Sequence, residues 1–411
     1  MHPKQGLLAL ILAALSAAPS HAAPPIGAAP PTDAAAADNA FGFRLLNAVQ
    51  KATPTDNVVL SPVSAALALS MVLNGASGQT KSEMLAALSL GERDLDAINA
   101  ANAQLIKLIR TPTQDVTLSV ADSLWVNSRR ATLRSDYRAQ MQASYDAEIS
   151  DLDFGDPNAA ARINGWASQE TQGRISRLID RLDTADLSLL LNAVYFKGQW
   201  THKFDKAQTQ TRDFTLAGGS VKQVPRMVQS GRFDYFETGD LQAIRLPFGE
   251  GDLVMEVLLP AKSSSLGALE KELTPEHWKG WQARYAPRPG RIELPRFELK
   301  AKYRLNEPLQ TLGMSRAFQP ERSQLTGMLA APGRPGAALF FISSVLQSIF
   351  WQVDEEGSEA AAVTSIGIRA AAVVRQPPPF QMIVDRPFFC AIEDRRSGAL
   401  LFVGAIFDPS A

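Results

Sequence analysis

Residues 353–375, with the sequence VDEEGSEAAAVTSIGIRAAAVVR, decide how the rest of the chain is interpreted. From Ser358 to Ala370 the residues fall into two alternating sets, and one set holds no charged side chain. Its members are small to medium in size: Ser358, Ala360, Ala362, Thr364, Ile366, Ile368 and Ala370. The other set holds Glu359 and Arg369. This alternation is typical of a strand with one buried and one solvent-facing side, about 43 Å long at ~3.3 Å per residue.

The flanks of this segment favour a different structure. The segment follows residues 338–353, which already have the character of a strand, across an acidic turn. It ends before Pro377–Pro379, whose nitrogen atoms cannot donate hydrogen bonds to a sheet. A long run of small residues without large apolar anchors is also typical of an exposed loop. Two interpretations remain: an exposed surface loop, or a segment that is a loop in one state and a strand in another.

Outside this segment, helical patterns come first along the chain and strand patterns dominate later. Ser61 and Pro62 have the character of an N-cap and a first helical residue, and Thr80–Glu83 has the spacing of a capping box. The predicted helices cover residues 38–51, 63–75, 80–88, 95–109, 134–145 and 156–170. The predicted strands cover residues 116–126, 187–200, 242–247, 253–259, 291–295, 338–353, 380–392 and 400–407. This order indicates one mixed α+β unit with large sheets.

The first residues have the pattern of a secretory signal peptide, which we place at residues 1–22. A charged start precedes the apolar run Leu7–Ala18, and Ser20–Ala22 has the small residues of a cleavage site. Residues 23–37 are rich in Ala and Pro and are predicted to be a flexible tether, followed by a single domain at 38–411. The apolar run is too short for a stable membrane span, and no cysteine follows it for lipid attachment. We expect an exported, soluble protein of a bacterial periplasm or of the cell exterior.

The composition argues against several classes of function. The 411 residues include 41 Lys and Arg against 42 Asp and Glu, so the basic excess of nucleic-acid-binding proteins is missing. The single cysteine, Cys390, lies in an apolar run and is predicted to be a small buried side chain. His202 and His277 are the only histidines after the predicted signal peptide, and no common catalytic or phosphate-binding motif is present. We therefore expect no metal site, no cofactor and no enzymatic activity.

Several segments resemble motifs of the serpin family of serine protease inhibitors. Residues 355–362 are similar to the hinge of the serpin reactive-centre loop, and residues 383–389 to the signature that follows this loop. Further matches lie in the family's order at residues 57–64, 171–175, 192–200 and 402–404. One such motif alone is a weak indication. Because the whole ordered set runs from about Asp38 to Pro409, the chain is identified as a member of the family.

The resemblance implies a fold of three β-sheets with eight or nine helices and an exposed reactive-centre loop at about residues 355–379. It also implies a trapping mechanism, in which a target serine protease cleaves the loop and forms an acyl-enzyme. The loop then enters the main sheet as a new strand. The uncharged set of residues 358–370 suits such a strand, because a buried and unpaired charge is costly. The expected partner is a serine protease in a covalent acyl complex. The inhibitor is expected to be a monomer that binds neither nucleic acid nor membrane.

The resemblance further assigns roles to individual residues. The hinge that enters the sheet first consists of Glu355, Glu356, Gly357, Ser358, Glu359, Ala360, Ala361 and Ala362. Ser61, Ser64 and Asn192 correspond to polar positions beneath the main sheet, where strands separate to admit the loop. Trp200 corresponds to the tryptophan at the top of that opening. Gln347 stands where the family often has a histidine, and its amide can still donate and accept hydrogen bonds.

The family's usual count from the hinge implies the position of the scissile bond. A count of fourteen residues from Gly357 places the bond between Ala371 and Ala372, whose small side chains suit elastase-like or subtilisin-like proteases. Arg369 and Arg375 are alternatives that suit trypsin-like enzymes. The alternative function is that of a non-inhibitory serpin acting as a binding or chaperone-like protein. Such members usually carry bulky, charged or proline residues in the hinge.

Overall fold

The computed structural model describes residues 32–111, 113–330, 340–356 and 378–410. These residues form the helices α1 (Asp33–Gln50), α2 (Pro62–Leu73), α3 (Gly78–Ala87), α4 (Leu95–Ile109), α5 (Ser135–Tyr145), α6 (Ala159–Glu170), α7 (Leu266–Lys271), α8 (Pro275–Gln282) and α9 (Asn306–Thr311). Helix α2 begins at Pro62 with Ser61 as its N-cap, which confirms the predicted start. No helix in the described ranges is long and apolar enough to cross a bilayer.

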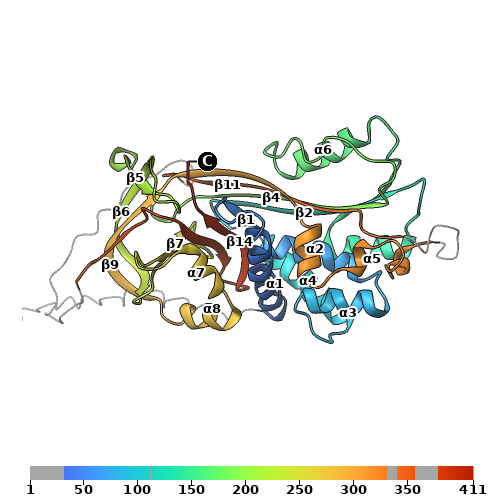
Figure 1. Ribbon diagram of the computed structural model, residues 1–411, viewed down its shortest axis with the longest axis horizontal. Helices are drawn as coiled ribbons and strands as arrows, with labels where there is room; N and C mark the ends of the chain where they lie inside the picture. Colours follow the sequence, from blue (N-terminus) through green and yellow to red (C-terminus); the bar gives the residue numbers. More distant parts are fainter. Residues whose placement is uncertain (1–31, 112, 331–339, 357–377, 411) are drawn as a thin grey trace, which may run out of the picture.

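A five-stranded sheet runs along the length of the molecule (Figure 1). Its strands follow the order β10 (Phe297–Arg304), β11 (Ser344–Val353), β4 (Ser188–Gly198), β2 (Val116–Asn127) and β3 (Glu148–Leu152). Strands β11 and β4 are parallel, whereas β4 and β2 are antiparallel and share a long ladder. Every residue of β4 except Lys197 is buried. The continuous apolar run predicted at 187–200 is therefore a central strand that is covered on both faces.

A nine-stranded sheet forms the other half of the fold. Its main path follows the order β1 (Val58–Leu60), β14 (Ala399–Ile406), β13 (Phe388–Asp394), β8 (Leu253–Pro260), β7 (Leu241–Phe248), β6 (Val221–Glu237), β9 (Ala286–Pro295) and β12 (Phe380–Ile383), while β5 (Gln210–Thr215) pairs with β6. The long strand β6 pairs with β5 and β9 through most of its length and with β7 only at its end. Two of the three expected sheets are thus joined into one by β6.

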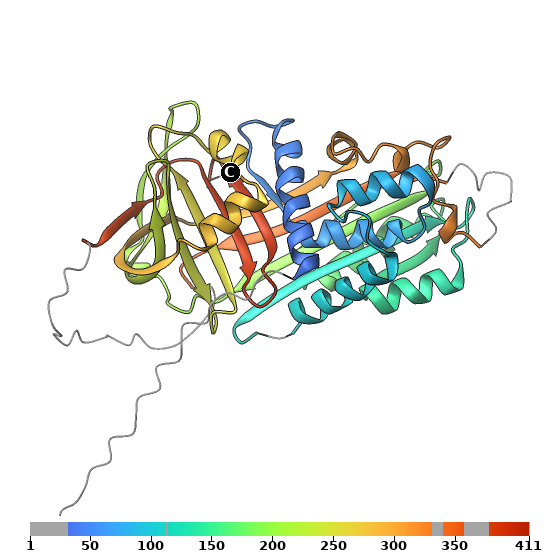
Figure 2. The same ribbon diagram turned by 90° about the horizontal axis from the view of Figure 1, so that it is seen from below.

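The five-stranded sheet separates two hydrophobic cores. Helix α6 lies alone on one face, where its Ile163 and Ala167 pack against Trp125, Leu191 and Tyr195 (Figure 1). Helices α2 to α5 lie on the opposite face, and α1 crosses the middle of the molecule beside β14 (Figure 2). All residues of α2 are buried, because this helix is apolar on every side and contacts β2, β4 and β14. The N-terminus of α2 is therefore held directly beneath the centre of the sheet.

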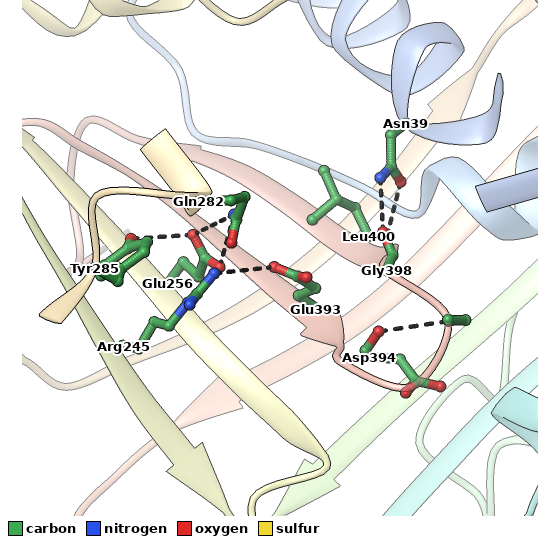
Figure 3. Close-up of polar contacts among 10 residues, drawn as sticks. Asn39, Arg245, Glu256, Gln282, Tyr285, Glu393, Asp394, Gly398 and Leu400 are labelled. Carbon is green, nitrogen blue, oxygen red and sulfur yellow. Dashed lines mark hydrogen bonds and ion pairs between the residues drawn. The ribbon is translucent and has the colours of Figure 1, made fainter. Parts of the chain in front are cut away.

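A group of buried ionisable side chains joins three strands of the nine-stranded sheet (Figure 3). We call Arg245, Glu256, Glu393, Gln282 and Tyr285 the charged cluster. The guanidinium of Arg245 on β7 donates from Nε to Glu256 of β8 at 3.0 Å, and its Nη2 lies 4.0 Å from Glu393 of β13. Gln282 and Tyr285 also donate to Glu256. Arg245, Glu256 and Glu393 are all buried, so the charges of Arg245 and Glu256 are balanced by each other and by polar neighbours rather than by water.

Two predicted starts in the helical part differ from the structure. Helix α1 begins at Asp33, after Thr32 as N-cap, so residues 33–37 of the predicted tether belong to the helix. Three of these residues are alanines with buried side chains, and alanine is the best helix former. The predicted capping box at 80–83 is wrong, since α3 begins at Gly78. Thr80 instead accepts a hydrogen bond from the amide of Gln324, and Glu83 accepts from the amides of Ser315 and Arg316.

Two predicted strands are also corrected. Strand β11 begins at Ser344, later than the predicted 338, because residues 340–343 have no ladder partner. Residues 380–392 are not one strand. They form β12, which is parallel to β9, and β13, which is antiparallel to β8 and β14. The break contains Pro387, which has no amide hydrogen to donate to a ladder. The burial of Cys390 in β13 confirms the prediction for the single thiol.

Candidate functional site: the hinge and the polar row beneath the sheet

Most of the predicted reactive-centre loop lies outside the described residues. Gly357, Ser358, Glu359, Ala360, Ala361, Ala362, Arg369, Ala371, Ala372 and Arg375 all fall within the range 357–377 that the structure does not describe. The structure places the start of the hinge, at Glu355 and Glu356, and the chain from Pro378 onward. It therefore places the strand from which the loop leaves, β11, and the strand that follows the loop, β12.

The backbone at the start of the hinge is tied to the segment that follows β4. The indole Nε1 of Trp200 donates to the carbonyl of Asp354 at 2.7 Å, and the amide of Phe204 donates to the carbonyl of Glu355 at 3.1 Å. Trp200 is buried and stacks on Phe248, with 4.3 Å between the ring centroids. The tryptophan predicted at the top of the opening thus lies against the end of β11.

The two described hinge carboxylates are bound in different ways. Glu355 is buried, and its Oε1 accepts from the Thr209 hydroxyl at 2.7 Å. Its Oε2 lies 3.6 Å from the guanidinium of Arg296. Glu356 is more exposed and forms an ion pair with Lys206, which lowers the pKa of the Glu356 carboxyl. The buried carboxylate thus has two partners, Thr209 and Arg296, and the exposed one pairs with Lys206.

A row of buried polar side chains lies where α2 meets the five-stranded sheet. It consists of Ser61 and Ser64 at the start of α2, Asp122 of β2, Asn192 of β4 and Gln347 of β11, and we call it the polar row. Asp122, Asn192 and Gln347 lie opposite one another in the register of the three neighbouring strands. The structure thus brings together the four side chains that the sequence predicts here and adds Asp122.

Gln347 connects α2 with the centre of the sheet. Its Oε1 accepts from the amide of Ser61 at 3.0 Å, and its Nε2 donates to the Ser61 carbonyl at 3.0 Å. The same Nε2 donates to Asn192 Oδ1 at 3.4 Å. Within the polar row, this bond is the contact between β11 and β4. A hydrogen bond contributes a net stability of about 0.5–1.5 kcal/mol. The bond between Gln347 and Asn192 therefore adds little to the pairing of β11 with β4, and water can replace it.

Asp122 is the residue that sequence reasoning missed. Its Oδ1 accepts from the Ser64 hydroxyl at 2.9 Å and from Asn192 Nδ2 at 2.6 Å. Burial raises the pKa of the Asp122 carboxyl to about 7, although these two bonds and the charge of Arg110 act in the opposite direction. The available signal was an acidic residue in the middle of the apolar run 116–126. Its position opposite Asn192 follows from the register of β2 and β4, which the sequence does not contain.

Other candidate groups offer no catalytic arrangement. His202 and His277 are exposed. Within the described ranges, no group of His, Cys, Asp and Glu side chains is arranged to hold a metal ion. The chemistry of this site is therefore that of hydrogen bonds across a strand pair and of ion pairs at the hinge.

Comparison with known proteins agrees with this geometry. The pattern of the family described as Serpin (serine protease inhibitor) matches residues 36–409. Iripin-2 of the tick Ixodes ricinus is 34% identical over 378 residues, which cover 90% of this chain and 92% of that protein. Serine protease inhibitor 42Dd of Drosophila melanogaster is 32% identical, and the match covers 88% of this chain and 94% of that protein. The chain therefore belongs to the serpin family, most of whose members are protease inhibitors.

Solved structures give the same result for the fold. The thermophilic serpin tengpin in its native state superposes with a TM-score of 0.79 at 27% identity, covering 90% of this chain and 93% of that chain. Native protease nexin-1 with heparin superposes with a TM-score of 0.82 at 27% identity, covering 92% and 100%. The architecture of helices and mixed sheets is thus that of a serpin.

Proposed function

We propose that the protein inhibits serine proteases as a suicide substrate, with the reactive-centre loop entering the five-stranded sheet between β11 and β4. The observation that carries this proposal is the parallel pairing of these two strands. The hinge leaves the end of β11, so a segment that turns back between the strands runs antiparallel to both. Insertion then replaces one parallel pair by two antiparallel pairs, and parallel pairing is slightly less stable per residue.

The alternation of residues 358–370 supports the same proposal. The set Ser358, Ala360, Ala362, Thr364, Ile366, Ile368 and Ala370 contains no charge, and we propose that this set faces the polar row and α2 after insertion. The charges of Glu359 and Arg369 then face the opposite side of the sheet. The 3.4 Å bond between Gln347 and Asn192 is the side-chain contact of the row that insertion breaks.

We propose Ala371–Ala372 as the scissile bond and elastase-like or subtilisin-like proteases as targets, because small side chains flank this bond. To test this, the pure protein is mixed with elastase-like, subtilisin-like and trypsin-like proteases. With the first two, we expect an adduct that survives denaturing electrophoresis, at the summed mass less that of the C-terminal peptide released by cleavage of the loop. The peptide released from the adduct should begin at Ala372. A peptide that begins at Ala370 or Gln376 assigns the bond to Arg369 or Arg375 instead.

A matched pair of loop variants tests the insertion step. Thr364→Arg puts a charge into the set proposed to be buried, so this variant is expected to be cleaved without forming an adduct. Ser365→Arg puts the same charge into the other set and is expected to form the adduct like the unchanged protein. If both variants form the adduct, or neither does, the result would contradict insertion with the Thr364 set buried and the Ser365 set on the opposite side of the sheet. Cleavage of the unchanged protein without any adduct would favour the alternative, a non-inhibitory serpin that acts as a binding protein.

We also propose that the protein is exported, with cleavage after Ala22, and that it acts as a monomer outside the cytoplasm. The charged start, the apolar run and the small residues at 20–22 support export. The intact mass of protein recovered from the periplasm or the medium tests this proposal, since the chain is expected to begin at Ala23. A recovered chain that begins at Met1 would contradict it.

A further inference from the structure

A cavity of about 600 Å³ opens beside β2 and reaches the polar row. Strand β3 pairs with β2 only from Ser123 onward, so residues 116–122 of β2 have no β3 neighbour, and the cavity lies at this place. The end of α4, the start of β3 and one face of α6 complete its wall. Its ionisable lining residues are Arg110, Asp122, Asp146, Glu148, Arg162 and Glu170. Asp122 is the residue that belongs to both the cavity and the polar row.

The charged groups around Asp122 leave its carboxyl without a close cationic partner. From α4, Arg110 is engaged in an ion pair with Asp146, which follows α5, and donates to the carbonyl of Val120 at 3.2 Å. From β3, Glu148 accepts a hydrogen bond from Ser150. From α6, Arg162 lies over the ring of Trp125 at 5.8 Å, and the Glu170 carboxyl also lines the cavity. From α2 and β4, Asp122 receives neutral donors, Ser64 and Asn192.

The polar row contains hydrogen bonds that link β2, β4, β11 and α2 to one another. Strand β4 is joined to β2 by the long ladder of residues 188–198 with 116–126, so these two strands move together. Helix α2 is joined to β11 by the two bonds between Ser61 and Gln347. Of the side-chain bonds of the row, Gln347–Asn192 links β11 to β4, whereas Ser64–Asp122 links β2 to α2, which packs on both β2 and β4. Separation of β4 from β11 breaks the bond between Gln347 and Asn192, whose Nδ2 donates to Asp122, and so admits water beside the Asp122 carboxyl.

We propose that Asp122 is a proton switch for the five-stranded sheet: its neutral acid form keeps β4 closed on β11, and its ionised form favours their separation. This inference rests on the proposed function insofar as that function requires the two strands to separate. The cavity provides the path by which protons and water reach the carboxyl from solvent. The side-chain amide of Gln347 does not ionise, so the titratable group of this row is on β2 rather than on β11.

The direction of the switch follows from proton linkage. In the closed sheet, burial raises the pKa of Asp122 to about 7, whereas a hydrated carboxyl in the open sheet has a pKa nearer to about 4. The state with the lower pKa is favoured as the pH rises. The opening equilibrium is therefore expected to increase by up to about tenfold per pH unit between these two values and to level off above about pH 7.

Hydrogen exchange of the full-length protein tests this switch without any protease. Amide exchange of β4 and β11 is measured at about pH 5 and about pH 8 and corrected for the intrinsic pH dependence of exchange. The unchanged protein is expected to show at least about tenfold more opening at the higher pH. Asp122→Asn keeps the shape and a carbonyl acceptor but cannot ionise, so its opening is expected to stay at the low level within about twofold. An unchanged pH response in Asp122→Asn overturns the proposal.

Two further variants keep the test decisive. Glu170→Gln removes an acid from the same cavity that makes no bond to the polar row, and it is expected to retain the full pH response. Ser64→Ala removes one donor to the carboxylate, so the midpoint of the response is expected to move to higher pH. A midpoint that does not move, or a loss of the response in Glu170→Gln, contradicts the proposal. Burial also raises the pKa of Asp38, Glu270 and Glu393, so each variant is compared with the unchanged protein at every pH.

Protease assays on the same samples separate the two proposals. If the unchanged protein forms no adduct but its exchange depends on Asp122, the inhibitory function fails and the switch stands. If the unchanged protein and Asp122→Asn form adducts at the same rate, and the pH response of amide exchange in β4 and β11 is the same in both, the switch fails and the inhibitory function stands.

Discussion

The polar row and the charged cluster both bury ionisable groups between neighbouring strands, but they hold these groups in opposite ways. In the charged cluster, Arg245 donates to Glu256 at 3.0 Å and lies over the ring of Tyr285 at 4.0 Å (Figure 3). In the polar row, Asp122 accepts hydrogen bonds from two neutral side chains, and one side-chain hydrogen bond, from Gln347 to Asn192, adds to the backbone ladder of β11 and β4. The charged cluster joins the antiparallel strands β7, β8 and β13. The hydrogen bond between the side chains of Gln347 and Asn192 instead links the parallel strands β11 and β4.

This difference determines how strongly the side chains hold each set of strands together. Removal of one partner from a buried ion pair costs about 3–5 kcal/mol, because the remaining charge is left uncompensated. Removal of a neutral hydrogen bond costs about 1–3 kcal/mol when its partner stays buried. Strands β7, β8 and β13 are thus held by contacts that are expensive to break. Strands β4 and β11 are held in the row by a contact that water can replace.

The largest effect is expected from Arg245→Met. This change leaves the buried carboxylate of Glu256 without the guanidinium that donates to it, so the free energy of unfolding is expected to fall by about 3–5 kcal/mol. Denaturant unfolding, followed by tryptophan fluorescence, measures the change. Arg232→Met, at an exposed position of the neighbouring strand β6, is the control and is expected to change stability little. Equal effects of the two variants would mean that the charged cluster does not stabilise the nine-stranded sheet.

The second effect is a pH dependence that comes from Glu393. Burial and the neighbouring charge of Glu256 raise the pKa of the Glu393 carboxyl well above its ordinary value. A group with a raised folded-state pKa stabilises the fold at low pH, and this stabilisation is lost as the pH rises through the folded-state value. The loss for one such group amounts to about 1.4 kcal/mol per pH unit over that interval.

Glutamine cannot ionise, so Glu393→Gln is expected to abolish the part of the stability loss at rising pH that comes from ionisation of Glu393. Unfolding curves of the two proteins, recorded from acid to alkaline pH, should diverge steadily as the pH increases, with the variant less sensitive to pH. Parallel curves would show that Glu393 is ionised in the folded protein throughout the range, and the cluster would then hold a net negative charge.

The same contrast shows what the sequence could provide. The start of α2 at Pro62 and the buried strand β4 were predicted, because an N-cap followed by proline and a continuous apolar run are local signals. The capping box at Thr80 and Glu83 was wrong, because both side chains bind backbone amides that are far away in the sequence. A local pattern cannot reveal that a distant segment uses its side chains.

The candidate site shows the same limit. The resemblance led to Ser61, Ser64, Asn192 and Gln347, and the structure brings all four together. It did not lead to Asp122, because a lone acid in a strand is usually solvent-exposed, and its burial here depends on the register of β2 and β4 and on the position of α2. Physical prediction of this residue requires the tertiary arrangement.

A smaller effect on stability is expected from Gln347→Met. The thioether fills a similar volume but leaves the buried amide of Ser61 without its acceptor, at a cost of about 1–3 kcal/mol. Because the bond to Asn192 is also lost, amide exchange of β4 and β11 should accelerate more than exchange of β7 and β8. Gln352→Met, at an exposed position of the same strand, is the control. Uniform acceleration in both sheets would show that the polar row does not act on this strand pair in particular.

The smallest effects are expected at the hinge, where the basic partners of the two carboxylates, Arg296 and Lys206, are exposed to solvent. Glu355→Gln keeps the acceptor for Thr209 and loses only the attraction of the half-exposed Arg296, so the expected cost is below about 1 kcal/mol. Glu356→Gln loses an exposed ion pair with Lys206 and is expected to leave the unfolding midpoint unchanged. The bond from Trp200 to the Asp354 carbonyl involves neither carboxyl, so the end of β11 should stay protected from exchange in both variants. Trp200→Phe removes this donor and should release the end of β11 while both hinge charges remain. If the two glutamine variants release it as strongly as Trp200→Phe, ion pairs rather than the indole hold the hinge, and the contrast with the charged cluster would not extend to this region.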